Sequence, residues 1–270
     1  MMETVGGRAS RSLARLLQWT RPAAQAVVDL LLPVRCAWCA GEVEDEDRRA
    51  LLCDKCRQVL GPETWPSCGR CGAAAPADLP RPADCPLCRK TRFFFETVVS
   101  LGGYKGELRN AILATKHARG DYLAVALGDL FAIRRAKEIE SLHPNLIVPV
   151  PMHWTRRLVR QANVPELLAR RMGKALGIPV GMALRQRRRT APQKTLLPRQ
   201  RFHNVRGAFA VRRGLHFRGG RRIGGRRIVL MDDVMTTGAT CSEAARTLIA
   251  AGADSVIVAV LARAEGDDRT

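Results

Sequence analysis

The chain after residue 93 alternates short apolar runs with amphipathic segments. The apolar runs are continuous rather than alternating with polar residues, which is typical of strands buried on both faces of a parallel sheet. The segments between them carry apolar residues at helical spacing. Strands alternating with helices of this length predict an α/β fold with right-handed crossovers. We expect strands over 96–104, 145–151, 228–234 and 255–263, and helices over 106–120, 122–140, 165–178 and 239–253.

The apolar run 228–231 stops at two adjacent acids, Asp232 and Asp233. Ligands of parallel sheets bind at the C-terminal ends of the strands, so these acids are expected at a ligand site. The loop after them leads into a predicted helix, where backbone N–H groups and the helix dipole favour an anion. We expect a phosphate in this loop, with the acids on ribose hydroxyls or on Mg²⁺. The loop residues are Thr236, Thr237, Gly238, Ala239 and Thr240.

A nucleotide-hydrolysing site would also place acids after an apolar strand. Such a site needs a G-x-x-x-x-G-K-[ST] loop elsewhere in the chain. The nearest segment, RRMGKALG, lacks the first glycine and the hydroxyl residue. The sequence therefore does not favour an NTPase.

Eight of the nine cysteines form four C-x-x-C pairs. Each pair offers two thiolates from a tight knuckle, and two pairs complete a tetrahedral zinc site. We expect two structural Zn²⁺ ions rather than disulfides, because nothing else in the chain suggests secretion. Consecutive pairs could share an ion, which we favour, or alternate pairs could do so in a cross-braced arrangement. Glycines at 41, 69 and 72 are expected to supply positive φ angles at the knuckles. The pairs are Cys36/Cys39, Cys53/Cys56, Cys68/Cys71 and Cys85/Cys88.

The 270 residues suffice for one α/β domain with a small satellite, and 46% of them are hydrophobic. The net charge of +20 favours polyanionic partners or substrates, although arginine-rich composition alone could also produce it. No acid occurs between Glu166 and Asp232, and this basic stretch is expected to handle phosphates, including those of single-stranded DNA.

No apolar run reaches the roughly 18–20 residues that a membrane-spanning helix needs. The N-terminal segment, which contains Arg8, Arg11, Arg15 and Arg21 among Leu and Ala residues, is expected to be an amphipathic helix rather than a targeting peptide. We therefore expect a cytoplasmic protein. Its expected parts are an amphipathic segment (1–32), a double zinc ribbon (33–92), the α/β domain (93–264) and a polar tail (265–270).

The segment IVLMDDVMTTGAT resembles the motif that binds phosphoribosyl pyrophosphate (PRPP) in type I phosphoribosyltransferases. Together with the cysteine-rich front end, it makes residues 30–264 similar to the ComF family of competence-related proteins. Further matching segments are LLPVRCAWC, YKGELRNAILATK, VPVPMH and APQKTLLPRQRFHNVRGAF. The resemblance implies a type I phosphoribosyltransferase-like parallel sheet with flanking helices, preceded by a double zinc ribbon.

The resemblance also implies roles for individual residues. Asp232 and Asp233 would act at the reaction centre, and a loop over 151–160 would bind pyrophosphate through Pro151, His153 and Arg160. A flexible loop over 187–201 would close on the site, with Arg187, Arg189 and Lys194 as catalytic cations and Gln193 and Arg201 as phosphate contacts. The segment at 160–165 keeps Arg160 and Asn163 but lacks the family's glycine and glutamine, which favours PRPP binding over turnover.

Two functions remain open from the sequence. The first is a ComF-type protein that binds Mg·PRPP, or a related phosphoribosyl ligand, and acts in DNA uptake or processing, with single-stranded DNA and competence-machinery proteins as partners. The alternative is an active phosphoribosyltransferase of nucleotide metabolism, either amidophosphoribosyltransferase-like or acting on a nucleobase.

Overall fold

The computed structural model describes residues 34–43, 51–75, 85–117, 120–152, 163–188, 190–191, 196–212 and 223–264. The predicted segments 1–32 and 265–270 lie outside these ranges.

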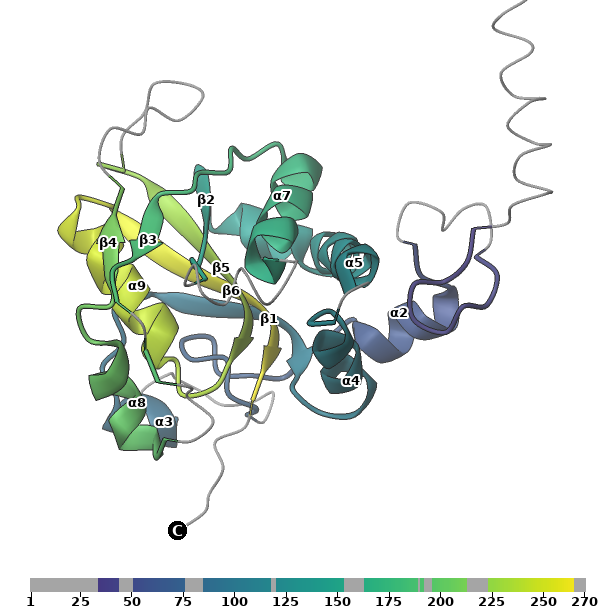
Figure 1. Ribbon diagram of the computed structural model, residues 1–270, viewed down its shortest axis with the longest axis horizontal. Helices are drawn as coiled ribbons and strands as arrows, with labels where there is room; N and C mark the ends of the chain where they lie inside the picture. Colours follow the sequence, from purple (N-terminus) through teal and green to yellow (C-terminus); the bar gives the residue numbers. More distant parts are fainter. Residues whose placement is uncertain are drawn as a thin grey trace, which may run out of the picture.

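A parallel sheet of four strands forms the centre of the molecule (Figure 1). Its spatial order is β1-β6-β5-β2, so the last strand in the sequence pairs with the first. The register is continuous across the two central strands, where Val229 lies opposite Ile257 and Met231 opposite Ala259. The bounds are β1 Thr97–Gly103, β2 Leu146–Pro149, β5 Arg227–Met235 and β6 Ser255–Arg263.

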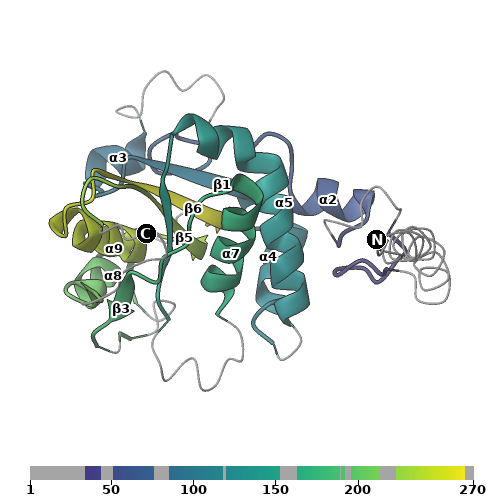
Figure 2. The same ribbon diagram turned by 90° about the horizontal axis from the view of Figure 1, so that it is seen from above.

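Helices cover both faces of this sheet, which explains the continuous apolar runs of its strands. Figure 2 shows α4, α5 and α7 on one side and α9 on the other. Alternate strand residues enter the two cores: Val229 packs on the α5 side and Leu230 on the α9 side. The predicted α/β fold and each of its predicted strands and helices are confirmed. The helices are α4 Gly106–Ala114, α5 Gly120–Ser141, α7 Val164–Leu176 and α9 Ala239–Ala250.

Three elements between α7 and β5 were not predicted. They are the antiparallel pair β3 (Leu184–Gln186) and β4 (Phe209–Val211) and the helix α8 (Pro198–Val205). The two strands have three residues each, and segments this short show no clear period, even though all three residues of β4 are apolar. The predicted flexible loop 187–201 therefore includes the first turn of a helix, which packs against α9.

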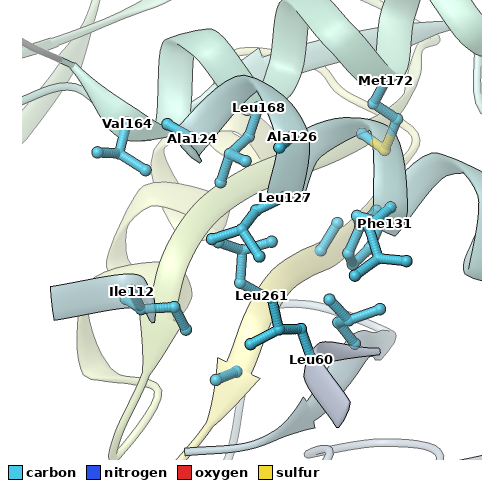
Figure 3. Close-up of a cluster of buried hydrophobic side chains, with 14 of the residues drawn as sticks. Leu60, Ile112, Ala124, Ala126, Leu127, Phe131, Val164, Leu168, Met172 and Leu261 are labelled. Atoms are coloured by element: carbon cyan, nitrogen blue, oxygen red, sulfur yellow. The ribbon is translucent and has the colours of Figure 1, made fainter. Parts of the chain in front are cut away.

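The cysteine-rich part packs on both sides of the sheet domain. Helix α2 (Asp54–Leu60) lies beyond α5, and α3 (Pro86–Lys90) lies on the side of α9 (Figures 1 and 2). Leu60 is fully buried in the same core as Leu127 and Leu261 (Figure 3).

The linker between the two cysteine clusters is fixed by a buried arginine. The Arg135 guanidinium of α5 donates to the carbonyls of Pro62 and Glu63 in this linker, at 3.0 and 2.7 Å. It also donates to the carbonyls of Ser100 and Leu101 in β1, both at 2.9 Å. The edge strand β1 and the linker are thereby held together.

In the described part of the chain, no helix is long and apolar enough to cross a membrane.

Candidate functional site

At the carboxyl end of the sheet, β5 extends beyond its neighbour β2. Strand β2 ends at Pro149, and the last bond along this edge runs from the Val150 amide to the Met231 carbonyl, at 2.8 Å. Strand β5 continues to Met235, two residues beyond the predicted acid pair, and among the described residues it pairs there only with β6. Asp232 and Asp233 therefore lie in the last residues of β5, beyond the part that pairs with β2, rather than in the following loop.

Asp232 points into the protein, toward α9. Its residue is 9% exposed, and its Oδ1 accepts a hydrogen bond from the Asp233 amide at 2.9 Å. Its Oδ2 lies 3.8 Å from the Cys241 thiol. Burial, and secondarily the charge of Asp233, raise the pKa of Asp232 well above its usual value. Asp232 is thus an interior carboxyl whose ionisation is disfavoured.

Asp233 points toward the end of α4 and is more accessible. Its Oδ2 lies 2.9 Å from the Lys116 ammonium, and both side chains are about one-fifth exposed. Lys116 lies just after α4, the helix that follows β1 in the chain. The two acids, which the sequence presented as an equivalent pair, therefore differ in burial, direction and partner.

The loop after β5 turns sharply into α9. Gly238 adopts φ +78°, and a Cβ at this position would lie 3.0 Å from the Phe93 ring and 3.4 Å from the Met235 methyl. The position therefore requires glycine for both its backbone conformation and its space. The Ala239 amide donates to the Thr237 hydroxyl at 3.4 Å, at the first residue of the helix. Thr236, Thr237 and Thr240 are half-buried at the mouth of this turn.

The structure places only some of the other predicted site residues. Pro151 follows β2 and is half-buried, and Arg187 is exposed directly after β3. Arg201 lies on α8, where its Nε donates to the Leu196 carbonyl at 3.1 Å. The remaining candidates lie outside the described residues: His153, Arg160, Arg189, Gln193 and Lys194.

Two residues near the loop were not among the predicted site residues. Lys116 could have been found from its place at the end of the first crossover helix, on the ligand side of the sheet. Arg263, the last residue of β6, is 2% exposed and donates to carbonyls of the loop and of the second cysteine cluster. A single arginine at the end of an apolar strand gives no sequence signal for this position.

The eight paired cysteines form two separate clusters. Cys36, Cys39, Cys53 and Cys56 make one, and Cys68, Cys71, Cys85 and Cys88 make the other. Within each cluster the sulfur atoms all lie within 4.8 Å of one another. The favoured pairing of consecutive C-x-x-C motifs is confirmed.

The spacing of the sulfurs fits a tetrahedral zinc ion. Zinc at about 2.3 Å from each sulfur sets a sulfur–sulfur separation of about 3.8 Å. The Cys39–Cys53, Cys68–Cys88 and Cys71–Cys85 separations are 3.7, 3.8 and 3.6 Å. A disulfide would need about 2.05 Å. Both clusters could hold a metal ion, and four cysteine ligands would leave no position for water.

The predicted glycine positions at the knuckles are only partly correct. Gly72 has φ +66°, as expected, whereas Gly41 and Gly69 are not in the left-handed region. In the first knuckle that conformation falls on Ala40, at φ +60°. In the first C-x-x-C motif of each cluster, the residue directly after the second cysteine therefore adopts the left-handed conformation. This residue is alanine in the first cluster and glycine in the second.

A parallel sheet whose strand β5 runs through two acids into a glycine-containing turn and a helix defines a phosphoribosyltransferase-type domain. Residues 166–269 match the family described as "Phosphoribosyl transferase domain". The chain is 30% identical over 228 residues to the DNA utilization protein YhgH of Escherichia coli K12, covering 78% of this chain and 96% of that protein. It therefore belongs to the ComF family.

A second relative matches most of the chain, and two solved structures match about half of it. Competence protein F of Haemophilus influenzae is 29% identical over 235 residues, covering 85% of this chain and 97% of that protein. Among solved structures, the purine phosphoribosyltransferase of Pyrococcus horikoshii is 19% identical, with a TM-score of 0.31, over 51% of this chain and 73% of that chain. The glutamine PRPP amidotransferase of Bacillus subtilis is 21% identical, with a TM-score of 0.36, over 56% of this chain and 30% of that chain.

Proposed function

We propose that this protein binds Mg·PRPP at the turn between β5 and α9 and acts in the uptake or processing of DNA, as the names of its relatives imply for those proteins. The observation that carries the proposal is the combination of an accessible acid, Asp233, with a glycine-containing turn at a helix N-terminus. Such a turn offers backbone N–H groups to a phosphate, and the acid next to it accepts from hydroxyl groups.

In this proposal the residues divide the ligand between them. Residues 236–240 receive the 5′-phosphate, and Asp233 holds a ribose hydroxyl after releasing Lys116. Mg²⁺ neutralises the pyrophosphate of the ligand when it is bound. Asp232, which is buried, supports the backbone of Asp233 rather than contacting the ligand.

The remaining site residues would serve the pyrophosphate side. Pro151, His153 and Arg160 belong to the loop after β2, which begins at the same end of the sheet as Asp233. The cations that would cover the leaving group are Arg187, Arg189 and Lys194, with Gln193 and Arg201 beside them. Turnover of PRPP as a phosphoribosyltransferase is the alternative, and it would require an acceptor in addition to this ligand.

The two cysteine clusters are proposed to hold structural Zn²⁺. The residues available fit this ion in number, ligand type and sulfur spacing. A segment this small has too few buried apolar residues to fold alone, so the metal would supply much of its stability.

Calorimetric titration of PRPP with Mg²⁺ tests the ligand. We expect binding by the natural protein and a loss of about 10-fold or more for Asp233→Asn, because a charge-assisted hydrogen bond of about 1.5–3 kcal/mol is removed. Asp254→Asn is the matched control, since this exposed acid lies at the opposite end of the sheet, before β6. Equal affinities of both variants would contradict the assignment. Release of pyrophosphate with candidate acceptors separates binding from turnover.

Binding of single-stranded DNA is the second proposed activity. The observation that favours it is the group of exposed arginines on the β3–β4 pair and beside α8, in a stretch that contains no acid from Leu167 to Met231. These residues are Arg185, Arg187, Arg188, Arg206 and Arg212.

Fluorescence anisotropy with a labelled oligonucleotide tests this activity. The logarithm of the affinity should fall with the logarithm of the salt concentration, at a slope of roughly −0.7 per phosphate contacted. Replacing Arg185 and Arg212 by Ala should weaken binding and reduce the slope. Arg170→Ala on α7, where the arginine is already paired with Glu166, should leave both unchanged. Binding that does not depend on salt would refute a phosphate-based interface.

A further inference from the structure

The guanidinium of Arg263 joins two parts of the molecule that lie far apart in the sequence. Its Nε donates to the Cys71 carbonyl, 192 positions earlier, at 2.9 Å. Its Nη1 donates to the Met235 carbonyl at 3.1 Å and also to the carbonyls of Thr236 and Ala264. Arg263 therefore connects the second cysteine cluster directly to the start of the proposed phosphate loop.

The charge of the buried Arg263 guanidinium has no carboxylate partner among its hydrogen-bond acceptors. Each acceptor that the structure gives for this guanidinium is a neutral backbone carbonyl. A buried cation is costly unless a negative charge compensates it. Four thiolates around one Zn²⁺ carry a net negative charge, and such a cluster at Cys68, Cys71, Cys85 and Cys88 would lie directly beside this guanidinium.

The cluster is also held sterically against Arg263. Gly72, the residue after Cys71, has φ +66°. A Cβ on Gly72 would lie 2.7 Å from the Val98 side chain in β1 and 3.8 Å from Cδ of Arg263. The knuckle therefore packs on the sheet without space for an additional atom. This close packing fixes the position of Cys71 relative to Arg263.

At its other end, Arg263 fixes the direction of the loop peptides. A trans peptide is planar, with its carbonyl and its N–H pointing in opposite directions. When the carbonyls of Met235 and Thr236 point to Arg263, the amides of Thr236 and Thr237 point away from it. These two amides belong to the turn that would receive the phosphate. The Met235 carbonyl also accepts from the Ala264 amide at 2.9 Å, so the arginine bears chiefly on the Thr236 carbonyl and hence on the direction of the Thr237 amide.

We propose that Arg263 is a positioning residue that couples the metal-bound state of the second cysteine cluster to the geometry of the phosphate loop. With the metal bound, the negative cluster holds the guanidinium in place, and the guanidinium holds the loop carbonyls. Without the metal, the knuckle that carries the Cys71 carbonyl is no longer fixed by its ligands, so Arg263 loses this acceptor position and the loop loses its anchor. The part of this inference that concerns ligand affinity rests on the proposed PRPP site.

The first cluster provides the matched comparison. Its contact with the sheet domain includes the Trp38 indole, which donates to Glu107 of α4 at 2.9 Å, and none of the contacts given for Arg263 reaches it. Cys39→Ser and Cys88→Ser should each remove one zinc ion, from the first and second cluster respectively. Only Cys88→Ser should affect the loop.

Hydrogen exchange of the amides of residues 235–240 tests the coupling without any ligand. We expect faster exchange in Cys88→Ser and in Arg263→Met, and unchanged exchange in Cys39→Ser. Arg135→Lys controls for the loss of a buried arginine, since Arg135 contacts β1 and the linker but not the loop. Unchanged exchange of residues 256–261 in β6 shows that a variant is folded. Arg263→Lys, which keeps the charge but not the planar fork, replaces Arg263→Met if the latter does not fold.

The affinity for Mg·PRPP is the second measurement. Cys88→Ser and Arg263→Met should weaken it by about 10- to 100-fold, as is typical when a supporting residue behind a binding group is removed, and Cys39→Ser should not. If the natural protein does not bind PRPP, the proposed function fails, and the exchange data still decide the coupling. Equal exchange in the two cysteine variants, or unchanged loop exchange in Arg263→Met, would overturn the inference.

Discussion

Replacement of Asp232 by asparagine should stabilise the protein. Asparagine keeps the shape of the side chain and the Oδ1 acceptor for the Asp233 amide, but it removes a charge from a position that is 9% exposed. Lys116, whose charge also acts on Asp232, pairs with Asp233 instead. The ionised Asp232 is therefore compensated mainly by one backbone amide.

The sign of the effect follows from the pKa. Burial raises the pKa of Asp232 in the folded protein above the value of 3.8 in an unfolded chain. The folded state thus holds this proton more tightly, and its stability falls as the pH rises from the unfolded value through the folded one. A difference of 1 between the folded and unfolded pKa values changes the free energy of unfolding by about 1.4 kcal/mol. Replacement of buried ion pairs by apolar residues in other proteins can gain about 1–4 kcal/mol, and for the removal of this single buried charge we expect about 2 kcal/mol.

Thermal unfolding measured by calorimetry from about pH 8 to about pH 5 tests this prediction. A gain of about 2 kcal/mol corresponds to a rise in Tm of roughly 4–8 °C for a chain of this size. The gain should shrink as the pH falls through the folded pKa of Asp232, because the natural protein then becomes neutral at this position. Asp254→Asn, which removes an exposed carboxylate, is melted at each pH as the reference for the loss of one negative charge. A destabilised Asp232→Asn protein at neutral pH, or a gain that does not change with pH, would refute the reasoning.

Two further predictions concern the cysteine clusters. Elemental analysis of the purified protein should find two zinc ions per chain, because both sulfur clusters match a tetrahedral site; absence of metal together with oxidised cysteines would contradict this. Ala40→Gly should stabilise the protein by about 1 kcal/mol, because Ala40 adopts φ +60°, which costs a residue with a Cβ roughly this amount. Gly72→Ala, at the equivalent turn, should destabilise it in the same melting experiment.

The strands and helices that bury one face or both could be predicted from the sequence. The run over 228–231 and the spacing within α7 leave little choice, because a continuous apolar strand and an amphipathic helix each have a characteristic period. The order of the cysteines along the chain favoured the consecutive pairing but left the cross-braced arrangement open, and the structure shows the consecutive one. These features depend on residues that are near one another in the sequence.

The features that were missed depend on contacts between distant residues. The different environments of Asp232 and Asp233 come from α9 and α4, which approach β5 from opposite faces of the sheet. The role of Arg263 requires that Cys71 lie beside the end of β6. Strands β3 and β4 are three residues long, and only their pairing with each other defines them. Sequence periodicity contains none of this information.

The strand order β1-β6-β5-β2 determines when the molecule can be completed during synthesis. Strand β1 is an edge strand whose sheet partner is β6, at the far end of the described chain. A ribosome releases the cysteine clusters and β1 first, and these must wait for about 150 further residues before their partner appears. During that interval Leu60, Leu101 and Val98 lack part of the core that later covers them. Early metal binding would hold the front end in a compact form while the rest of the chain is made, and it would limit aggregation through the open edge of β1.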